Sequence, residues 1–176
     1  MILLIKPCKE YEEDIFRYKE EMIAAGNTDL DGCGFLQNYT SVDEWIKFLD
    51  SFADRNKIDT STGFVEGSQY LLVDDDRHKI IGMVNLRHYL NDFLLRAGGH
   101  IGYSVRPDER KKGYAKLLLR LALEKIADVG VSDVLVTCDC DNEASSRTIE
   151  ACGGILENET YSEEFGCNIK RYWIHL

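Results

Sequence analysis

The chain has 176 residues, a length typical of a single domain (1–176) that can bury a hydrophobic core. Its 44% hydrophobic and 30% charged residues are typical of a soluble globular protein and exclude a disordered one. A formal net charge of -10 argues against nucleic-acid binding, which needs positive charge over many phosphates, and it is compatible with a cationic substrate.

The N-terminus and the cysteines indicate where the protein works. The opening residues, MILLIKPCKEYEED, contain an apolar run too short for a secretory signal, and no stretch is long enough to span a membrane. The six cysteines include no C-x-x-C pair, and several lie inside apolar runs. This pattern favours buried free thiols over disulfides or a zinc site. We therefore predict a cytoplasmic protein that binds neither membrane nor nucleic acid.

The first third of the chain predicts one strand and two helices. MILLIK is typical of a strand, and apolar residues at helical spacing predict a helix over 10–25, ended by Gly26. After a polar loop, Ser41 and Glu44 form a capping-box pattern that predicts the start of a second helix.

From residue 68 the pattern alternates between strands and helices. We predict a hairpin of two strands, a third strand, a long helix, a short apolar strand, a helix capped by Asn142 and ended by Gly153, and a final antiparallel pair. Their ranges, in the same order, are 68–76, 79–90, 100–105, 113–129, 133–139, 142–154, 155–162 and 167–176. The segment 100–139 is long enough for a right-handed parallel crossover, so the fold class is α/β or α+β.

A basic stretch precedes the long helix of this acidic chain. Between Arg106 and Arg120 there are six Lys or Arg against two acids, and Gly113 lies where the helix starts. No Ser, Thr, Asp or Asn near Gly113 caps the free N–H groups of the first turn, which attract anions. These features predict a phosphate pocket, with a solvated basic surface as the alternative. Neither a P-loop nor a dinucleotide-binding fingerprint is present.

Two short motifs in this region resemble the GNAT N-acetyltransferase superfamily. The run 110–115, RKKGYA, matches its R/Q-x-x-G-x-G/A loop and lies, as in that family, between a strand ending at Val105 and a leucine-rich helix. The run 142–145, NEAS, closed by Gly153, is similar to its N-x-x-S helix. The resemblance covers about residues 68–155, and the element order of the whole chain is consistent with it.

The resemblance implies a mixed, mostly antiparallel sheet with a central splayed parallel strand pair and flanking helices. It also implies acetyl-CoA as acetyl donor, with its diphosphate on backbone N–H groups of the loop and its pantetheine arm between strands 100–105 and 133–139. The implied cofactor-binding residues are Ser104, Val105, Arg110, Lys111, Lys112, Gly113, Tyr114, Ala115, Lys116, Asn142 and Ser145. For Asn142, a simple helix cap and a place beside the pantetheine arm are compatible with each other.

The resemblance also implies N-acetylation of a primary amine, on a small molecule or a protein, by direct attack. The family's usual tyrosine acid is replaced here by Ile149, so Tyr103 and Tyr161 are alternative acids, or the thiolate leaves unaided. His100 has the intrinsic pKa of a base and lies where the family often places one. The catalytic candidates are therefore His100 and Tyr103, and a backbone N–H near Val105 can bind the oxyanion.

The acceptor site and two alternatives complete the expectation. The resemblance implies an acceptor site built mainly from 1–67 and 91–99, where Asp29 and Asp31 can meet a cationic amine. Residues 27–38 resemble the start of an EF-hand but lack its final Glu, so we expect no metal site.

An acetyl-cysteine on Cys138 or Cys140 is disfavoured, because both belong to an apolar strand region. The alternative function is a non-catalytic acyl-CoA-binding sensor or carrier module. A homodimer stays open as an alternative to a monomer.

Overall fold

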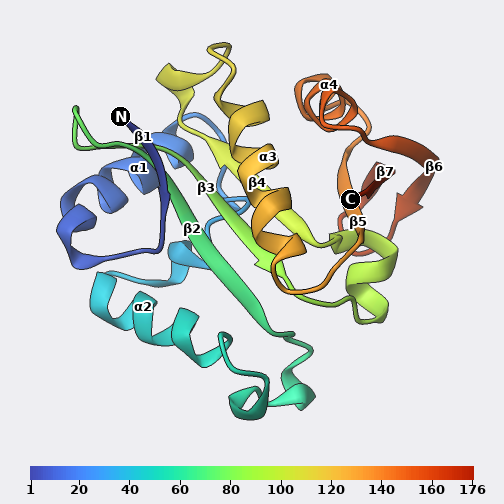
Figure 1. The fold of residues 1–176 in the computed structure, drawn as a ribbon, viewed down its shortest axis with the longest axis horizontal. Helices are drawn as coiled ribbons and strands as arrows, with labels where there is room; N and C mark the ends of the chain where they lie inside the picture. Colours follow the sequence, from blue (N-terminus) through green and yellow to red (C-terminus); the bar gives the residue numbers. More distant parts are fainter.

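The computed structural model describes residues 1–59 and 61–176 in full, and it contains each strand and helix predicted from the sequence (Figure 1). In chain order the main elements are β1 (Ile2–Ile5), α1 (Glu12–Ala24), α2 (Val42–Ser51), β2 (Gly67–Asp74), β3 (Lys79–Arg87), β4 (Ile101–Val105), α3 (Tyr114–Ala127), β5 (Asp133–Asp139), α4 (Glu143–Ala151), β6 (Ile155–Ser162) and β7 (Cys167–His175). A π-helical turn, Leu94–Gly98, precedes β4.

The strands form two antiparallel sheets that diverge from a common fork. One sheet has the order β1-β2-β3-β4 and the other β5-β7-β6. β4 and β5 run in the same direction, toward the top of Figure 1, and α3 runs back between them. They touch at their starts, where the N–H of His100 donates to the carbonyl of Leu135 at 2.7 Å. The predicted splayed parallel pair is therefore confirmed.

Alternate residues of the four-stranded sheet pack into two separate cores. Leu72 and Ile81 point to one face and pack with α3. Leu71 and Met83 point to the other face and pack with α1 and α2, where Trp45 is fully buried. Each such side chain contributes on the order of 1.5–3 kcal/mol by leaving water. The sheet is therefore held rigidly between helices on both faces. β4 is the edge strand of this sheet, and its position is fixed with it.

Local capping signals in the sequence act as predicted. The side chain of Ser41 accepts from the N–H of Glu44 at the start of α2. The side chain of Asn142 accepts from the N–H of Ser145 at 3.1 Å and caps α4. Gly153 ends that helix with a φ of +93°. All three signals are confirmed. The sequence could predict them because each depends on a few neighbouring residues only.

Arg106 corrects the prediction of a continuous basic stretch. Its side chain is 1% exposed and is bound by Asp14 at 2.9 Å and Glu21 at 2.6 Å, both on α1. This arginine anchors α1 to the end of β4 and is not part of a surface that binds anions. A buried ion pair must be this complete, because an unpaired buried charge costs several kcal/mol.

The prediction of buried free thiols is confirmed only in part. All six thiols are free, as predicted, but Cys33 is buried while the other five are partly exposed. Cys138 is partly buried and packs against the core on the α3 side of the sheet. None of the helices that the structure describes is long and apolar enough to cross a membrane.

Candidate active site

A cavity of about 580 Å³ lies between the end of β4 and the starts of α3 and α4. Its walls come from α1 and the loop after it, the end of β4, the loop before α3 and the start of α4. The predicted cofactor residues that line it are Ser104, Val105, Arg110, Lys111, Gly113, Ala115, Lys116, Asn142 and Ser145. Lys112 and Tyr114 lie outside this lining: Lys112 binds Glu109 at 2.9 Å, and Tyr114 packs against the core.

The start of α3 presents free backbone donors to this cavity. Gly113 occupies the N-cap position with a φ of +88° and supplies no side-chain cap. Within the described residues, the N–H groups of Tyr114, Ala115 and Lys116 have no acceptor. A Cβ on Gly113 would meet no protein atom within 4 Å, so the backbone there is open to a ligand. The helix dipole and these donors together favour a phosphate.

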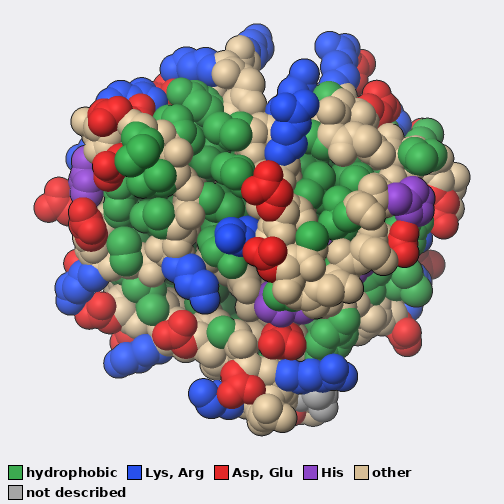
Figure 2. Space-filling view, in the orientation of Figure 1, with side chains coloured by type: hydrophobic (Ala, Val, Ile, Leu, Met, Phe, Trp, Pro, Cys, Tyr) green, Lys and Arg blue, Asp and Glu red, His purple; other side chains and the backbone are tan. Residues whose placement is uncertain are grey.

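Charges around the loop hold it in place. Glu109 is 1% exposed and binds Arg77 at 2.7 Å, with Lys79 and Lys112 each at 2.9 Å. Hydrogen bonds from these cations, Arg77 first, lower the pKa of Glu109 to about 2. Figure 2 shows further Lys and Arg side chains gathered along the upper edge of the molecule, over the start of α3. The loop is thus fixed by one buried carboxylate and keeps positive charge on its outer side.

The edge of β4 that faces β5 carries free backbone groups. On the other edge, which pairs with β3, the backbone carbonyl of His100 accepts from the N–H of Arg87, and the N–H of Arg106 donates to the carbonyl of Ile81. Both distances are 2.8 Å. Because backbone groups alternate between the two edges of a strand, Tyr103 and Val105 turn theirs toward β5. The Nε of Arg110 donates to the carbonyl of Val105 at 3.1 Å, in agreement with this orientation. The N–H of Val105 has no acceptor among the described residues and faces the cavity.

Tyr103 and Ser145 bridge the cavity from β4 to α4. Their hydroxyl oxygens lie 2.9 Å apart. Burial raises the pKa of Tyr103 to about 12, and hydrogen bonding to Ser145 offsets part of this rise. Ile149, the position of the missing tyrosine, is fully buried in the core behind α4. A phenol therefore reaches this space from β4.

His100 is located at the fork itself. Its Nδ1 accepts from the N–H of Leu135 at 2.9 Å, and the residue is 5% exposed. Burial and the nearby charge of Arg87 lower the pKa of His100 to about 4. The basic nitrogen of a neutral imidazole is thus occupied by a structural hydrogen bond.

Asp31 lines the same cavity from the loop after α1. Its pKa is raised by removal from water, and further by the negative charges of Asp29 and Asp139. A carboxylate with a raised pKa at the wall of a cavity accepts a proton more readily than an ordinary one. The sequence indicated Asp31 as a contact for a cationic amine, and gave no sign that it would line the same cavity as the predicted cofactor residues.

The cysteines of this region do not contribute a nucleophile to the cavity wall. The Sγ of Cys138 lies 3.4 Å from the hydroxyl of Ser146, and burial raises its pKa. Burial, with Glu159 nearby, raises the pKa of Cys140 to about 11. Neither thiol lines the cavity between β4 and the starts of α3 and α4. Both groups stay protonated at neutral pH, which makes them poor nucleophiles.

A second cavity, of about 870 Å³, lies on the α1 and α2 side of the sheet. Both segments predicted for the acceptor contribute to it: Phe35 from the first loop, and Asn91, Phe93 and Arg96 from the segment before β4. The first residues of β2 and the last residues of β3 also line it. No group of three or more His, Cys, Asp or Glu that could hold a metal ion occurs in the described part of the chain.

The acetyltransferase (GNAT) domain model matches residues 3–155, which is most of the chain. The chain belongs to the GNAT acetyltransferase family. It is an acetyltransferase that takes its acetyl group from acetyl-CoA and transfers it to an amine. The free donors at α3 and the open edge of β4 fit a diphosphate and a pantetheine arm, in agreement with this assignment.

Solved structures with this fold include several acetyltransferases. A mutant of the spermidine N-acetyltransferase SpeG from Vibrio cholerae is 18% identical, with a TM-score of 0.63, and the match covers 99% of this chain and 94% of that one. The ribosomal-protein-S5-alanine acetyltransferase from Vibrio fischeri is 16% identical, with a TM-score of 0.67 and coverage of 99% and 91%. The microcin C7 self-immunity acetyltransferase MccE, in complex with acetyl-CoA and AMP, is 18% identical, with a TM-score of 0.67 and coverage of 99% and 92%. Comparison with curated proteins finds no match.

Proposed function

We propose that this acetyltransferase acylates a primary amine by direct attack, without an acyl-enzyme. One observation carries the proposal: the cavity between β4 and the starts of α3 and α4 brings together free backbone donors, the phenol of Tyr103 and the carboxylate of Asp31. The raised thiol pKa values of Cys138 and Cys140, and their place outside the cavity wall, support direct transfer.

Backbone groups hold the donor in this proposal. The N–H groups of Tyr114, Ala115 and Lys116 bind the diphosphate, and Arg110 and Lys111 add positive charge. The free edge of β4 pairs with the amides of the pantetheine arm. The N–H of Val105 binds the developing oxyanion, because it is the free donor closest to the end of that edge.

Tyr103 and Asp31 move the protons. Asp31 accepts a proton from the attacking amine, since its raised pKa makes it a stronger base than an ordinary aspartate. Tyr103 donates its proton to the departing thiolate, and Ser145 fixes the direction of its hydroxyl. We assign the base to Asp31 in preference to His100, because Nδ1 of His100 already accepts from Leu135.

Amine-dependent release of CoA tests this function. Purified protein is incubated with acetyl-CoA and a panel of primary amines, and free thiol is followed together with the mass of the product. Release that depends on an added amine, with an increase of one acetyl group, supports the proposal. Tight acetyl-CoA binding without turnover of any amine would favour the alternative of an acyl-CoA sensor or carrier, for which Ile149 in place of tyrosine is the specific observation.

The setting of the enzyme is also a proposal. Six thiols without a disulfide support a reducing compartment, and we propose the cytoplasm.

We also propose a homodimer, supported by β6, an edge strand that is exposed along nearly its whole length. Sedimentation of the purified chain decides between one and two copies.

A further inference from the structure

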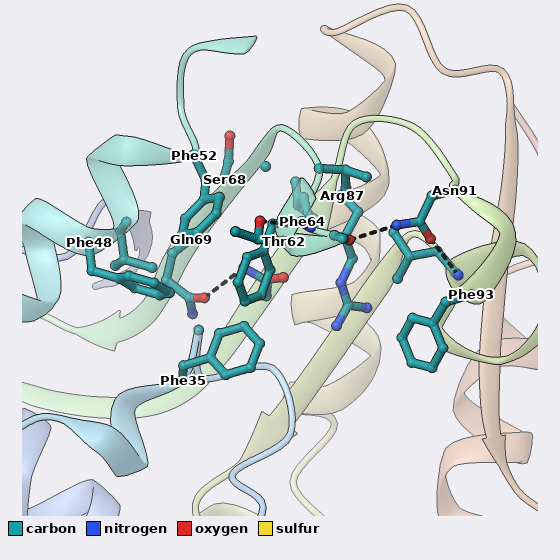
Figure 3. A pocket seen from close by; sticks show the side chains of 18 of the residues that line it. Phe35, Phe48, Phe52, Thr62, Phe64, Ser68, Gln69, Arg87, Asn91 and Phe93 are labelled. Carbon is teal, nitrogen blue, oxygen red and sulfur yellow. Dashed lines mark hydrogen bonds between the residues drawn. The ribbon is translucent and has the colours of Figure 1, made fainter. Parts of the chain in front are cut away.

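The cavity on the α1 and α2 side of the sheet is lined by aromatic rings (Figure 3). Phe35, Phe48, Phe52, Phe64 and Phe93 all contribute to its wall. The ring centroids of Phe35 and Phe64 lie 5.3 Å apart at 83°, and those of Phe52 and Phe64 lie 4.9 Å apart at 63°. Such edge-to-face clusters bind another apolar or aromatic group well. A volume of about 870 Å³ is in the range of small-molecule sites.

The backbone of Phe35 supports a binding role for this wall. Its φ is +60°, a left-handed conformation that is unusual for a bulky aromatic residue. The ring is nevertheless 45% exposed, so burial of Phe35 does not account for the strain. Backbone strain of this kind is concentrated at ligand sites, where it holds a side chain in position for the ligand.

Three charged side chains line the cavity: Asp92, Arg96, which pairs with Glu164 at 2.9 Å, and Arg87 at the end of β3. In Figure 3 its guanidinium extends into the space between Phe64 and Phe93. Its Nη1 donates to the carbonyl of Gly98 at 3.1 Å, and no carboxylate of the described residues lies within ion-pair distance. Burial lowers the pKa of Arg87 to about 10, and Asp31 offsets part of this. The group stays cationic at neutral pH and has donors left for an anion.

This guanidinium lies next to the acetyl-donor cavity. A Cβ placed on Gly102 would be 3.4 Å from both Nη1 and Nη2 of Arg87, so the guanidinium lies over the β4 backbone one residue before Tyr103. Gly32 packs its backbone against Tyr103, and its neighbour Asp31 lines the donor cavity. Arg87 lines one cavity and Asp31 the other, and the guanidinium of Arg87 and the backbone next to Asp31 both lie over the Gly102–Tyr103 segment of β4.

We propose that the acceptor is a free α-amino acid with an aromatic side chain. Arg87 binds its carboxylate, Asp31 faces its amine, and the phenylalanine wall receives its ring. The inference rests on the proposed function, because the amine must lie beside the thioester. One carboxylate and one amine on the same carbon suit a cation and an anion whose segments lie over the same face of β4, at Gly102.

The same geometry disfavours two other classes of acceptor. A polyamine would place a second ammonium group near Arg87 and would leave its guanidinium without an anion. A phosphate dianion would face Arg87 with Asp92 in the same wall, and the second arginine, Arg96, is already paired with Glu164, which leaves too little positive charge. A single carboxylate matches Arg87, the lining cation that has no carboxylate partner among the described residues, and the planar donors of its guanidinium.

The transfer is balanced in atoms and charge. The amine nitrogen, after giving one proton to Asp31, attacks the acetyl carbonyl carbon, and a C–N bond forms. The C–S bond breaks, and the thiolate takes the proton of Tyr103. The second amine proton leaves through solvent, which also reprotonates the phenolate of Tyr103 and receives the proton held by Asp31. The products are an N-acetyl amino acid and CoA.

The test compares each amino acid with its amide. L-phenylalanine and L-tryptophan are assayed against L-phenylalaninamide, L-alanine and spermidine, with CoA release and product mass as readouts. We expect kcat/KM for L-phenylalanine to exceed that for its amide at least about 10-fold, because a charge-assisted contact is lost in the amide. Arg87→Met should reduce this acid-to-amide ratio to within about 2-fold. Lys125→Met, a surface change of equal charge on α3, should leave the ratio unchanged.

Binding of L-phenylalanine by calorimetry in the presence of CoA separates the two proposals. Preference for the acid in binding, without turnover of any amine, would support the aromatic amino-acid site at Arg87 and overturn the proposed function. Turnover of spermidine with no binding of L-phenylalanine would do the reverse. Equal use of acid and amide by the parent protein, or an unchanged ratio in a folded Arg87→Met variant, would overturn the inference.

Discussion

Leu135 and His100 hold the two halves of the sheet together by a reciprocal pair of hydrogen bonds. The N–H of Leu135 donates to Nδ1 of His100 at 2.9 Å, and the N–H of His100 donates to the carbonyl of Leu135 at 2.7 Å. Beyond this pair β4 and β5 separate, and the donor cavity begins. His100 is therefore a residue of the fork, and its loss should affect stability before it affects chemistry.

Replacing His100 with Leu should destabilise the protein by about 1–3 kcal/mol, because the buried N–H of Leu135 loses its acceptor. His100→Asn offers an amide oxygen close to the position of Nδ1 and should recover part of this loss. Urea unfolding of both variants measures the difference. Equal stability of the Leu and Asn variants would show that the hydrogen bond to Leu135 does not matter.

The same histidine makes stability depend on pH. Its pKa is about 4 in the folded protein and near 6.5 when unfolded, so the unfolded chain binds the extra proton between these values. The contribution of His100 to the free energy of unfolding is fully present above pH 6.5. It is lost as pH falls toward 4, and the total loss is roughly 3 kcal/mol. His100→Asn should remove this component of the stability curve, measured by urea unfolding at a series of pH values.

Tyr103→Phe should lower kcat about 10- to 100-fold and leave acetyl-CoA affinity nearly unchanged, because the phenol acts on the leaving thiolate. Since burial holds the pKa of Tyr103 at about 12, the parent rate should not fall between pH 7 and 10 through loss of this proton. Tyr161→Phe is the matched control, as Tyr161 is 61% exposed and lies outside the cavity wall. A normal kcat in Tyr103→Phe would remove Tyr103 from the mechanism.

Asp31→Asn should lower kcat/KM about 100-fold by removing the base. In the parent, kcat/KM should fall as pH decreases through the raised pKa of Asp31, since the protonated carboxyl cannot accept a proton. Asp29 raises that pKa by its negative charge, so Asp29→Asn should move the acid limb to lower pH. A limb that stays in place, or moves upward, would contradict a role for Asp31 as the titrating base.

The sequence predicted those parts of the site that depend on neighbouring residues. Gly113 with its positive φ, the cap at Asn142 and the end of α4 at Gly153 each follow from a few adjacent positions. The missing cap at α3 was also visible in the sequence, and it identified the loop that now lines the cavity.

The rest depends on contacts between distant segments. Arg106 belonged by composition to the basic stretch, yet its partner Asp14 is 92 residues away in the chain and removes it from the surface. Arg87 occupied an ordinary polar position at the end of a strand. Because Gly102 has no side chain, the guanidinium of Arg87 can lie against the β4 backbone, near Asp31 and the donor cavity. Periodicity carries no information about such juxtapositions.

The glycine at the start of α3 gives the sharpest test of how the donor is held. Gly113→Val should weaken acetyl-CoA binding at least about 10-fold, because the β-branched side chain opposes a φ of +88° and enters the space beside the free N–H groups. Lys111→Ala should cost less, within about 1 kcal/mol, since it removes one screened surface charge. Calorimetry with acetyl-CoA and with dephosphorylated pantetheine measures both effects, and the pantetheine should bind each variant as it binds the parent.

Gly130→Val controls for strain alone. Gly130 lies just past the other end of α3 with a φ of +87°, and a Cβ there also meets no protein atom within 4 Å. Both glycine variants should therefore lose similar stability in thermal melts, but Gly113→Val alone should lose affinity for acetyl-CoA. If Gly130→Val weakened binding equally, strain in the helix would explain the loss. If Lys111→Ala weakened binding more than Gly113→Val did, side-chain charge and not the backbone would hold the diphosphate.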